Sequence, residues 1–133
     1  MKNRPMLTLE DCRKITAAAE AEARKNNWNV CIAILDDGGH LLHLARMDGA
    51  SPANARIAVE KGRTAAETRR STATWQERVG KRPELLMMPG VTPVQGGLPI
   101  VAEGVCVGAV GISGVQSHED EQVAAAGIKA LSG

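Results

Sequence analysis

The sequence contains no phenylalanine and no tyrosine, and Trp28 and Trp75 are its only aromatic residues. Hydrophobic residues nevertheless make up 44% of the 133 residues, so aliphatic side chains and alanine must fill the interior. Small side chains let helices lie close to a sheet, but each of them removes little apolar area from water. We therefore expect apolar faces that a second copy of the chain covers, and hence self-association.

The sequence also lacks a strong charge of either sign, because 16 basic residues face 15 acidic residues and the net charge is +1. No stripe of interleaved basic and aromatic residues is present, which argues against a nucleic-acid partner. No run approaches the roughly 20 apolar residues that cross a bilayer. Residues 1–6 contain no hydrophobic signal core, so we expect no membrane partner.

The three cysteines, Cys12, Cys31 and Cys106, follow neither a CxxC spacing nor a Cys/His ligand spacing. Each lies within an apolar periodic segment, which favours reduced, buried thiols over disulfides or zinc ligands. We therefore expect a cytoplasmic protein.

The order of the predicted elements indicates one domain over residues 1–133, because no linker or shift in composition divides the chain. Two pairs of strands separated by short turns predict hairpins, and the hairpins predict an antiparallel sheet with helices packed on it, the α+β class. Gly62, inside the second predicted helix, indicates close packing there. The predicted elements are a helix at 8–26, a hairpin at 29–47, a helix at 51–70, a short helix around Trp75, an irregular segment at 81–95, a hairpin at 96–114 and a helix from Ser117.

The second hairpin is rich in glycine, with Gly108, Gly111 and Gly114 in or next to its return strand. The spacing lacks the G-x-G pair of a dinucleotide loop and the Gly-Lys-Ser/Thr of a P-loop. Glycines in a strand more often mark bulges or the close approach of another backbone or a ligand. We expect this hairpin to line a ligand pocket, an oligomer contact or both.

Two groups of polar residues could carry chemistry. Arg46 and Asp48 lie on one face of a predicted strand, and Lys61 lies on the next helix, so the three could surround a substrate carboxylate or form a surface set of salt bridges. The spacing alone leaves these two interpretations open. The acidic residues that follow His118 could bind a metal, but acids in a first helical turn are what the helix dipole favours.

Several ordered motifs together resemble the GlcG/HbpS family, which includes the C-terminal domain of PduO. The chain carries GGHLLHLARMDGA at 38–50, Lys61, GGLPI at 96–100, GVCVGAVGISG at 104–114, and Asp120 with Glu121. The resemblance covers nearly the whole chain. It implies a profilin-like fold with a five-stranded antiparallel sheet and flanking helices, and assembly into dimers or larger rings, with octamers among them.

The same resemblance implies where a ligand would bind, with the segment at 81–95 closing over the pocket. Some members of the family bind haem, for which Arg46 or Lys61 would suit the propionates and a histidine the iron. The absence of Phe and Tyr argues against haem, because few flat apolar surfaces remain to enclose a macrocycle. The implied ligand-binding residues are Arg46, Asp48, Lys61, Gly96, Gly97, Pro99 and Gly114, and the candidate haem ligands are His40, His43 and His118.

Three functions follow as hypotheses. The first is a small-ligand-binding protein whose ligand is haem or a related tetrapyrrole. The second is an enzyme or accessory protein that acts on a small organic acid, aldehyde or diol in a catabolic operon, with Arg46 or Lys61 holding the anion and Asp48 moving a proton. The third is a scaffold whose glycine-rich faces only assemble subunits. We favour ligand binding, and whether the chain is an enzyme stays open.

Overall fold

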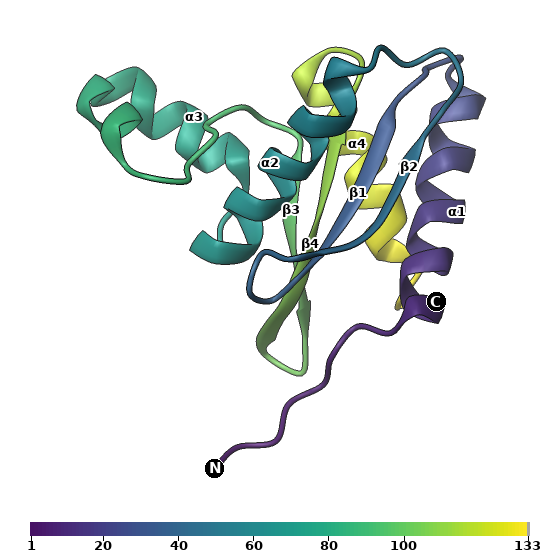
Figure 1. Cartoon of the computed structure of the whole chain (residues 1–133), viewed down its shortest axis with the longest axis horizontal. Helices are drawn as coiled ribbons and strands as arrows, with labels where there is room; N and C mark the ends of the chain where they lie inside the picture. Colours follow the sequence, from purple (N-terminus) through teal and green to yellow (C-terminus); the bar gives the residue numbers. More distant parts are fainter. Residues whose placement is uncertain (133) are drawn as a thin grey trace.

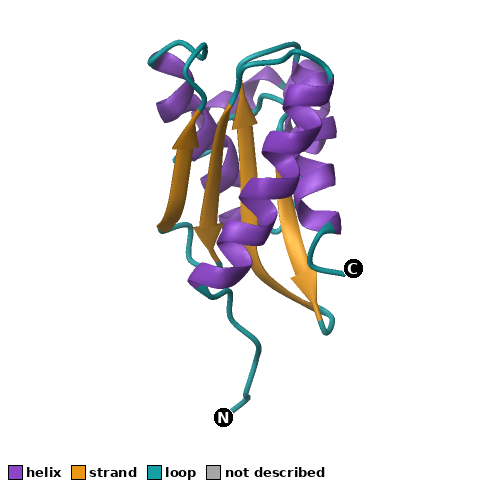
Figure 2. Ribbon diagram, turned by 90° about the vertical axis from the view of Figure 1, so that its right-hand side faces the viewer, coloured by secondary structure: helices purple, strands orange, loops and turns teal. Residues whose placement is uncertain are grey.

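A four-stranded antiparallel sheet, in the order β2-β1-β4-β3, forms the centre of the computed structural model, which describes residues 1–132 (Figures 1 and 2). Both predicted hairpins are present, and β1 pairs with β4 between them. The α+β class is therefore confirmed. The strands are β1 (Cys31–Asp36), β2 (Leu41–Arg46), β3 (Gly97–Ala102) and β4 (Val105–Ser113).

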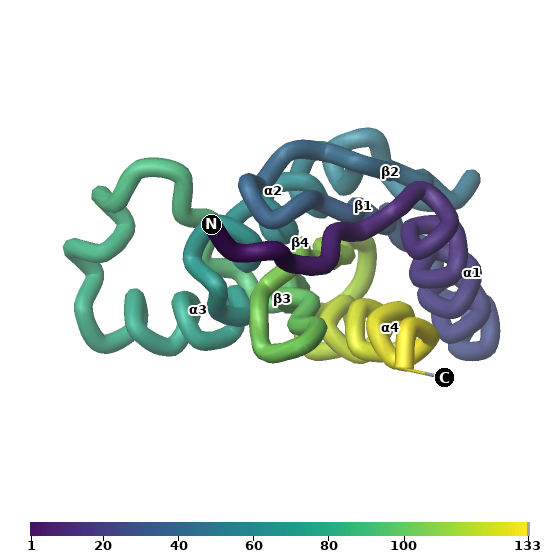
Figure 3. The backbone as a smooth tube through the Cα atoms, turned by 90° about the horizontal axis from the view of Figure 1, so that it is seen from below, coloured from purple at the N-terminus to yellow at the C-terminus, as the bar shows by residue number. Residues whose placement is uncertain are grey.

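The sheet has four strands, so the five strands that the family resemblance implied are wrong. Instead of a further strand, the chain between α2 and β3 forms α3 (Thr72–Lys81), the 3-10 helix η1 (Pro83–Met87) and a loop. Prolines recur in this segment, and proline cannot donate the backbone hydrogen bond that a ladder requires. We call residues 72–95 the arm, because they extend away from the sheet on the side of β3 (Figures 1 and 3).

Helices cover both faces of the sheet. On one face α1 (Leu9–Lys25) and α4 (Ser117–Lys129) pack against each other, and on the other face α2 (Ala53–Thr68) packs across β1, β4 and β3 (Figure 3). Among residues 1–132, every helix is too short or too polar to cross a bilayer.

Strand β1 is buried on both of its faces, as its nearly continuous apolar run predicts. Ile32 and Ile34 belong to the core between the sheet and α1 with α4. Cys31, Ala33 and Leu35, which alternate with them, belong to the core beneath α2. This alternation follows from the period of two residues in a strand, and it makes β1 the strand that joins the two layers.

The backbone of α2 lies directly on the backbone of β4, because both carry glycine at the point of contact. A Cβ atom added to Gly111 would lie 2.0 Å from the carbonyl oxygen of Ala58 and 2.5 Å from the amide nitrogen of Gly62. A Cβ atom added to Gly62 would lie 2.1 Å from Cδ2 of Leu35. The close packing predicted at Gly62 is therefore confirmed, and the backbone that approaches Gly111 is that of α2.

Replacing Gly111 with alanine should destabilise the fold, because the new methyl group meets backbone atoms that no rotamer change can move. We expect Gly111→Ala to lower the free energy of unfolding by about 1–3 kcal/mol in urea, as overpacked cores do. Gly80→Ala is the matched control, since a Cβ atom there meets nothing within 4 Å. Alanine in α3 should leave stability unchanged or raise it by up to about 1 kcal/mol. Equal effects of the two substitutions would contradict this account of the contact.

Candidate functional site

The exposed residues of the predicted site lie at one end of the sheet. In the strand register, Arg46 of β2 and Ser113 of β4 both stand opposite Cys31 of β1. Asp48 follows β2 and Gly114 follows β4, so both lie at this same end. We call this end, with Arg46, Asp48 and Gly114, the sheet-end surface. Arg46 and Asp48 are exposed, and Gly114 is half-buried.

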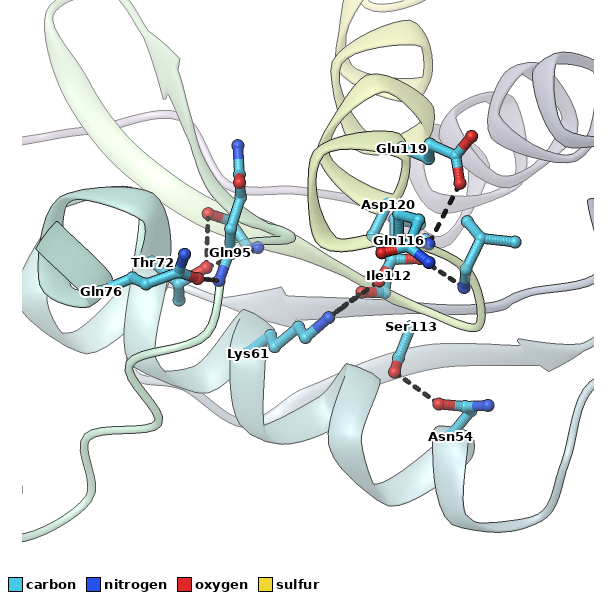
Figure 4. Close-up of polar contacts among 12 residues, drawn as sticks. Asn54, Lys61, Thr72, Gln76, Gln95, Ile112, Ser113, Gln116, Glu119 and Asp120 are labelled. Atoms are coloured by element: carbon cyan, nitrogen blue, oxygen red, sulfur yellow. Dashed lines mark hydrogen bonds and ion pairs between the residues drawn. The ribbon is translucent and has the colours of Figure 1, made fainter.

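Lys61 belongs to the predicted set but does not reach solvent, because it is 2% exposed. Its Nζ donates one hydrogen bond to the carbonyl oxygen of Ile112 and one to Oδ2 of Asp120, each at 3.0 Å (Figure 4). Lys61 lies on α2 and Asp120 on α4, which cover opposite faces of the sheet. This ion pair therefore ties the two helical layers together, and its ammonium group is already neutralised.

Asp120 is equally enclosed, with 1% of its surface exposed. Its Oδ1 accepts a hydrogen bond from the backbone amide of Val115 at 3.1 Å, which fixes the connection from β4 to α4. Burial raises the pKa of the Asp120 carboxyl group, and the ammonium of Lys61 opposes that rise only in part. An aspartate in the first turn also matches the dipole of α4. The carboxylate is thus a structural partner of Lys61.

Gly96 and Gly97 are buried and pack closely against Lys61. Gly96 has a φ of 134°, in the region that favours glycine, and a Cβ atom there would lie 2.8 Å from Nζ of Lys61. At Gly97 a Cβ atom would lie 2.3 Å from the carbonyl oxygen of Lys61. The amide of Gly97 donates to Oγ1 of Thr72 at 2.8 Å. Pro99 is half-buried within β3, opposite Ala109, and so lies farther from the sheet end.

The structure therefore divides the predicted residues into two groups. Arg46, Asp48 and Gly114 form an accessible surface, whereas Lys61 and its two glycine neighbours form the buried frame beside it. The arm does not cover Arg46, because it lies on the side of β3 and Arg46 lies on β2, the opposite edge strand.

The sequence did not reveal Asp120 as the partner of Lys61 or Thr72 as the partner of Gly97. An acid in a first helical turn has the same pattern whether it meets solvent or a buried lysine. Within the arm, the backbone amide of Gln95 donates a hydrogen bond to Oε1 of Gln76 at 2.8 Å (Figure 4). Nε2 of Gln95 donates to Oε2 of Glu121 at 3.1 Å, which fixes the end of the arm to α4. No sequence motif indicates these contacts, since they join distant segments.

The histidines do not converge on one place. His40 is exposed at the start of β2, at the end of the sheet opposite Arg46, and His118 is exposed in the first turn of α4. His43 is half-buried, with its Nδ1 3.2 Å from Oγ1 of Thr16. In the part of the chain that the structure describes, no three His, Cys, Asp or Glu residues are placed to hold a metal ion.

A test for haem follows from these positions. An enclosed haem needs an axial ligand in a cavity, and histidine is a common one. Five of the surface cavities formed by residues 1–132 have linings without histidine. None of these five cavities therefore offers a histidine to an enclosed haem iron.

The fold and the glycine-dependent frame define a class of small α+β proteins with an antiparallel sheet between two helical layers. The model of one such family, described as haem degrading protein HbpS-like, matches residues 7–129. Protein GlcG of Escherichia coli K12 is 46% identical over 114 residues, which cover 85% of each chain. The chain belongs to the HbpS-like family, as the sequence resemblance indicated.

Solved structures agree with this assignment. A crystal structure of HbpS superimposes with a TM-score of 0.91 at 33% identity, over 98% of this chain and 94% of that one. A double mutant of HbpS from Streptomyces reticuli gives the same TM-score and identity. A crystal structure of a complex of PduOC with haem superimposes with a TM-score of 0.87 at 25% identity, over 95% of both chains.

Removing the charge of Lys61 should expose how much the frame depends on its ion pair. Lys61→Met leaves a carboxylate buried without a cation, so we expect a loss of about 3–5 kcal/mol in the free energy of unfolding at pH 7. The deficit should shrink as the pH falls, because the folded-state pKa of Asp120 rises further in this variant and the protonated acid needs no cation.

Two further variants show whether the loss of stability comes from breaking the buried ion pair. Adding Asp120→Asn to Lys61→Met should recover part of the loss, since the amide oxygen still accepts from Val115 and no charge remains. Lys81→Met, which removes only an exposed pair with Glu77, should change stability by less than about 0.5 kcal/mol. If Lys61→Met were as mild as Lys81→Met, the ion pair would not hold the layers together.

Proposed function

We propose that the chain binds a haem-related ligand, a flat tetrapyrrole that carries carboxylate groups. The observation that supports this most strongly is the likeness, over 95% of both chains, to PduOC, whose crystal structure is a complex with haem. The description of the matching family as haem degrading and HbpS-like supports the same ligand class. Binding is the proposed activity, and no chemical step is assigned to the chain.

The sheet-end surface is the proposed place of binding. Arg46 is exposed and lies within ion-pair distance of no acidic side chain among residues 1–132, so its guanidinium group is free to hold a carboxylate. Asp48 and the half-buried Gly114 would border the ligand. In this proposal Lys61, Gly96 and Gly97 support the surface from within, and Pro99, which lies farther from the sheet end, does not contact the ligand.

A second copy of the chain is the proposed cover for this open surface. Leu42 and Leu44 of the edge strand β2 are each 39% exposed, beside Arg46 on the same strand. Pairing of this edge, or packing on these leucines, would enclose a ligand that one copy leaves in solvent. We expect light scattering to give the molar mass of a dimer or of a larger ring, up to an octamer. A protein that stays at 14.0 kDa at micromolar concentration would contradict the self-association.

Substitution of Arg46 tests the ligand and its place together. Titration with hemin should give a saturable shift of the Soret band, and Arg46→Ala should weaken binding by about tenfold, the loss typical of one charge-assisted hydrogen bond. Arg13→Ala, in an exposed part of α1, is the control and should bind as the unmodified protein does. Absence of a saturable band would reject the ligand class. Equal affinities of the two variants would reject the sheet-end surface.

A further inference from the structure

The arm contains a cavity that is separate from the sheet-end surface. It lies between α3 and η1 and has a volume of about 410 Å³, within the range of sites for small molecules. Its walls come from the arm alone, and they combine cations with apolar side chains. The lining residues are Trp75, Arg78, Lys81, Arg82, Leu85 and Met88.

Half of the residues that line this cavity are cationic. Arg78, Lys81 and Arg82 line it without an acidic residue, although the whole chain has a net charge of only +1. Arg78 forms no ion pair with residues 1–132, while Lys81 and Arg82 pair only with the exposed Glu77 and Glu84, at 3.3 and 3.4 Å. Exposed pairs of this kind contribute little, so an incoming anion can replace them.

The dipole of α3 explains only part of this arrangement. Basic residues in the last turn of a helix complement its carbonyl end, which accounts for Arg78 and Lys81. It does not account for Arg82, which lies beyond the last turn, or for the apolar wall that the three cations share. The combination is instead what an anion with an apolar body requires.

Trp75 gives the cavity a fixed flat wall. Its indole nitrogen donates to Oγ1 of Thr68 at 2.9 Å, which anchors the ring to the end of α2. The guanidinium carbon of Arg78 lies 5.3 Å from the ring centroid, the geometry of a cation–π contact. Leu85 and Met88 complete the apolar lining, and a thioether packs well against an aromatic ring.

We propose that this cavity binds a small aromatic carboxylate, with the acid group among Arg78, Lys81 and Arg82 and the ring against Trp75, Leu85 and Met88. An inorganic anion would make no contact with the apolar wall, and an uncharged ring would form no ion pair with the cations. The proposal is independent of haem binding at the sheet end, because the two places share no residue.

A fluorescence experiment tests it, because the chain has no tyrosine and only two tryptophans. In Trp28→Phe, Trp75 is the sole donor of energy to 8-anilino-1-naphthalenesulfonate, an aromatic sulfonate used here as the probe. We expect saturable sensitised emission that 2-naphthoate abolishes by competition. The uncharged 2-naphthamide should compete at least about tenfold less well, because it lacks the charge that the three cations bind.

Charge variants in the same background locate the site. Arg78→Gln and, separately, Lys81→Gln should each weaken the affinity for 2-naphthoate at least about fivefold, while circular dichroism confirms that the fold is kept. Lys25→Gln is the matched control, since Lys25 is also exposed in the last turn of a helix and pairs with a glutamate of that helix. Absence of saturation, equal competition by the amide, or equal affinities of all three variants would each overturn the proposal.

Discussion

The contact between α2 and β4 is the constraint on which the rest of the structure depends. It brings two backbones together without side chains between them, which requires glycine at Gly62 and Gly111. The close approach brings the Lys61 side chain to the end of β4, where it donates to the carbonyl oxygen of Ile112 and to Asp120 of α4 on the far layer. A chain without phenylalanine or tyrosine gains its tight packing in this way, from small residues and one buried ion pair.

The frame also explains why one group of predicted site residues is buried and the other is accessible to solvent. Gly96, Gly97 and Gly111 of the second hairpin lie against Lys61 or the backbone of α2, so they serve packing within the chain. The polar residues that remain accessible, Arg46 and Asp48, lie where β2 ends, and both are exposed. A rigid frame beneath an open charged surface is a suitable arrangement for a site that a ligand and a second copy complete together.

Local signals predicted much of this fold from the sequence. Both hairpins form where the short turns predict them, and α1 (Leu9–Lys25) lies within the helix predicted at 8–26. The expected fifth strand came from resemblance alone, and the arm instead forms α3, η1 and a loop. The burial of Lys61 could not be predicted, because the sequence places this residue on a helix without showing which acid, 59 residues later, neutralises it. The cavity of the arm was missed for the same reason, since it forms only when α3 and η1 fold back on each other.

Hydrogen exchange of the protein with and without hemin tests the central claim most directly, because it locates the ligand without altering the chain. The account predicts that hemin slows exchange at residues 46–50 and 114–118, at the sheet end, and leaves residues 72–95 of the arm unchanged. Slower exchange confined to the arm, or no change at the sheet end under saturating hemin, would contradict it.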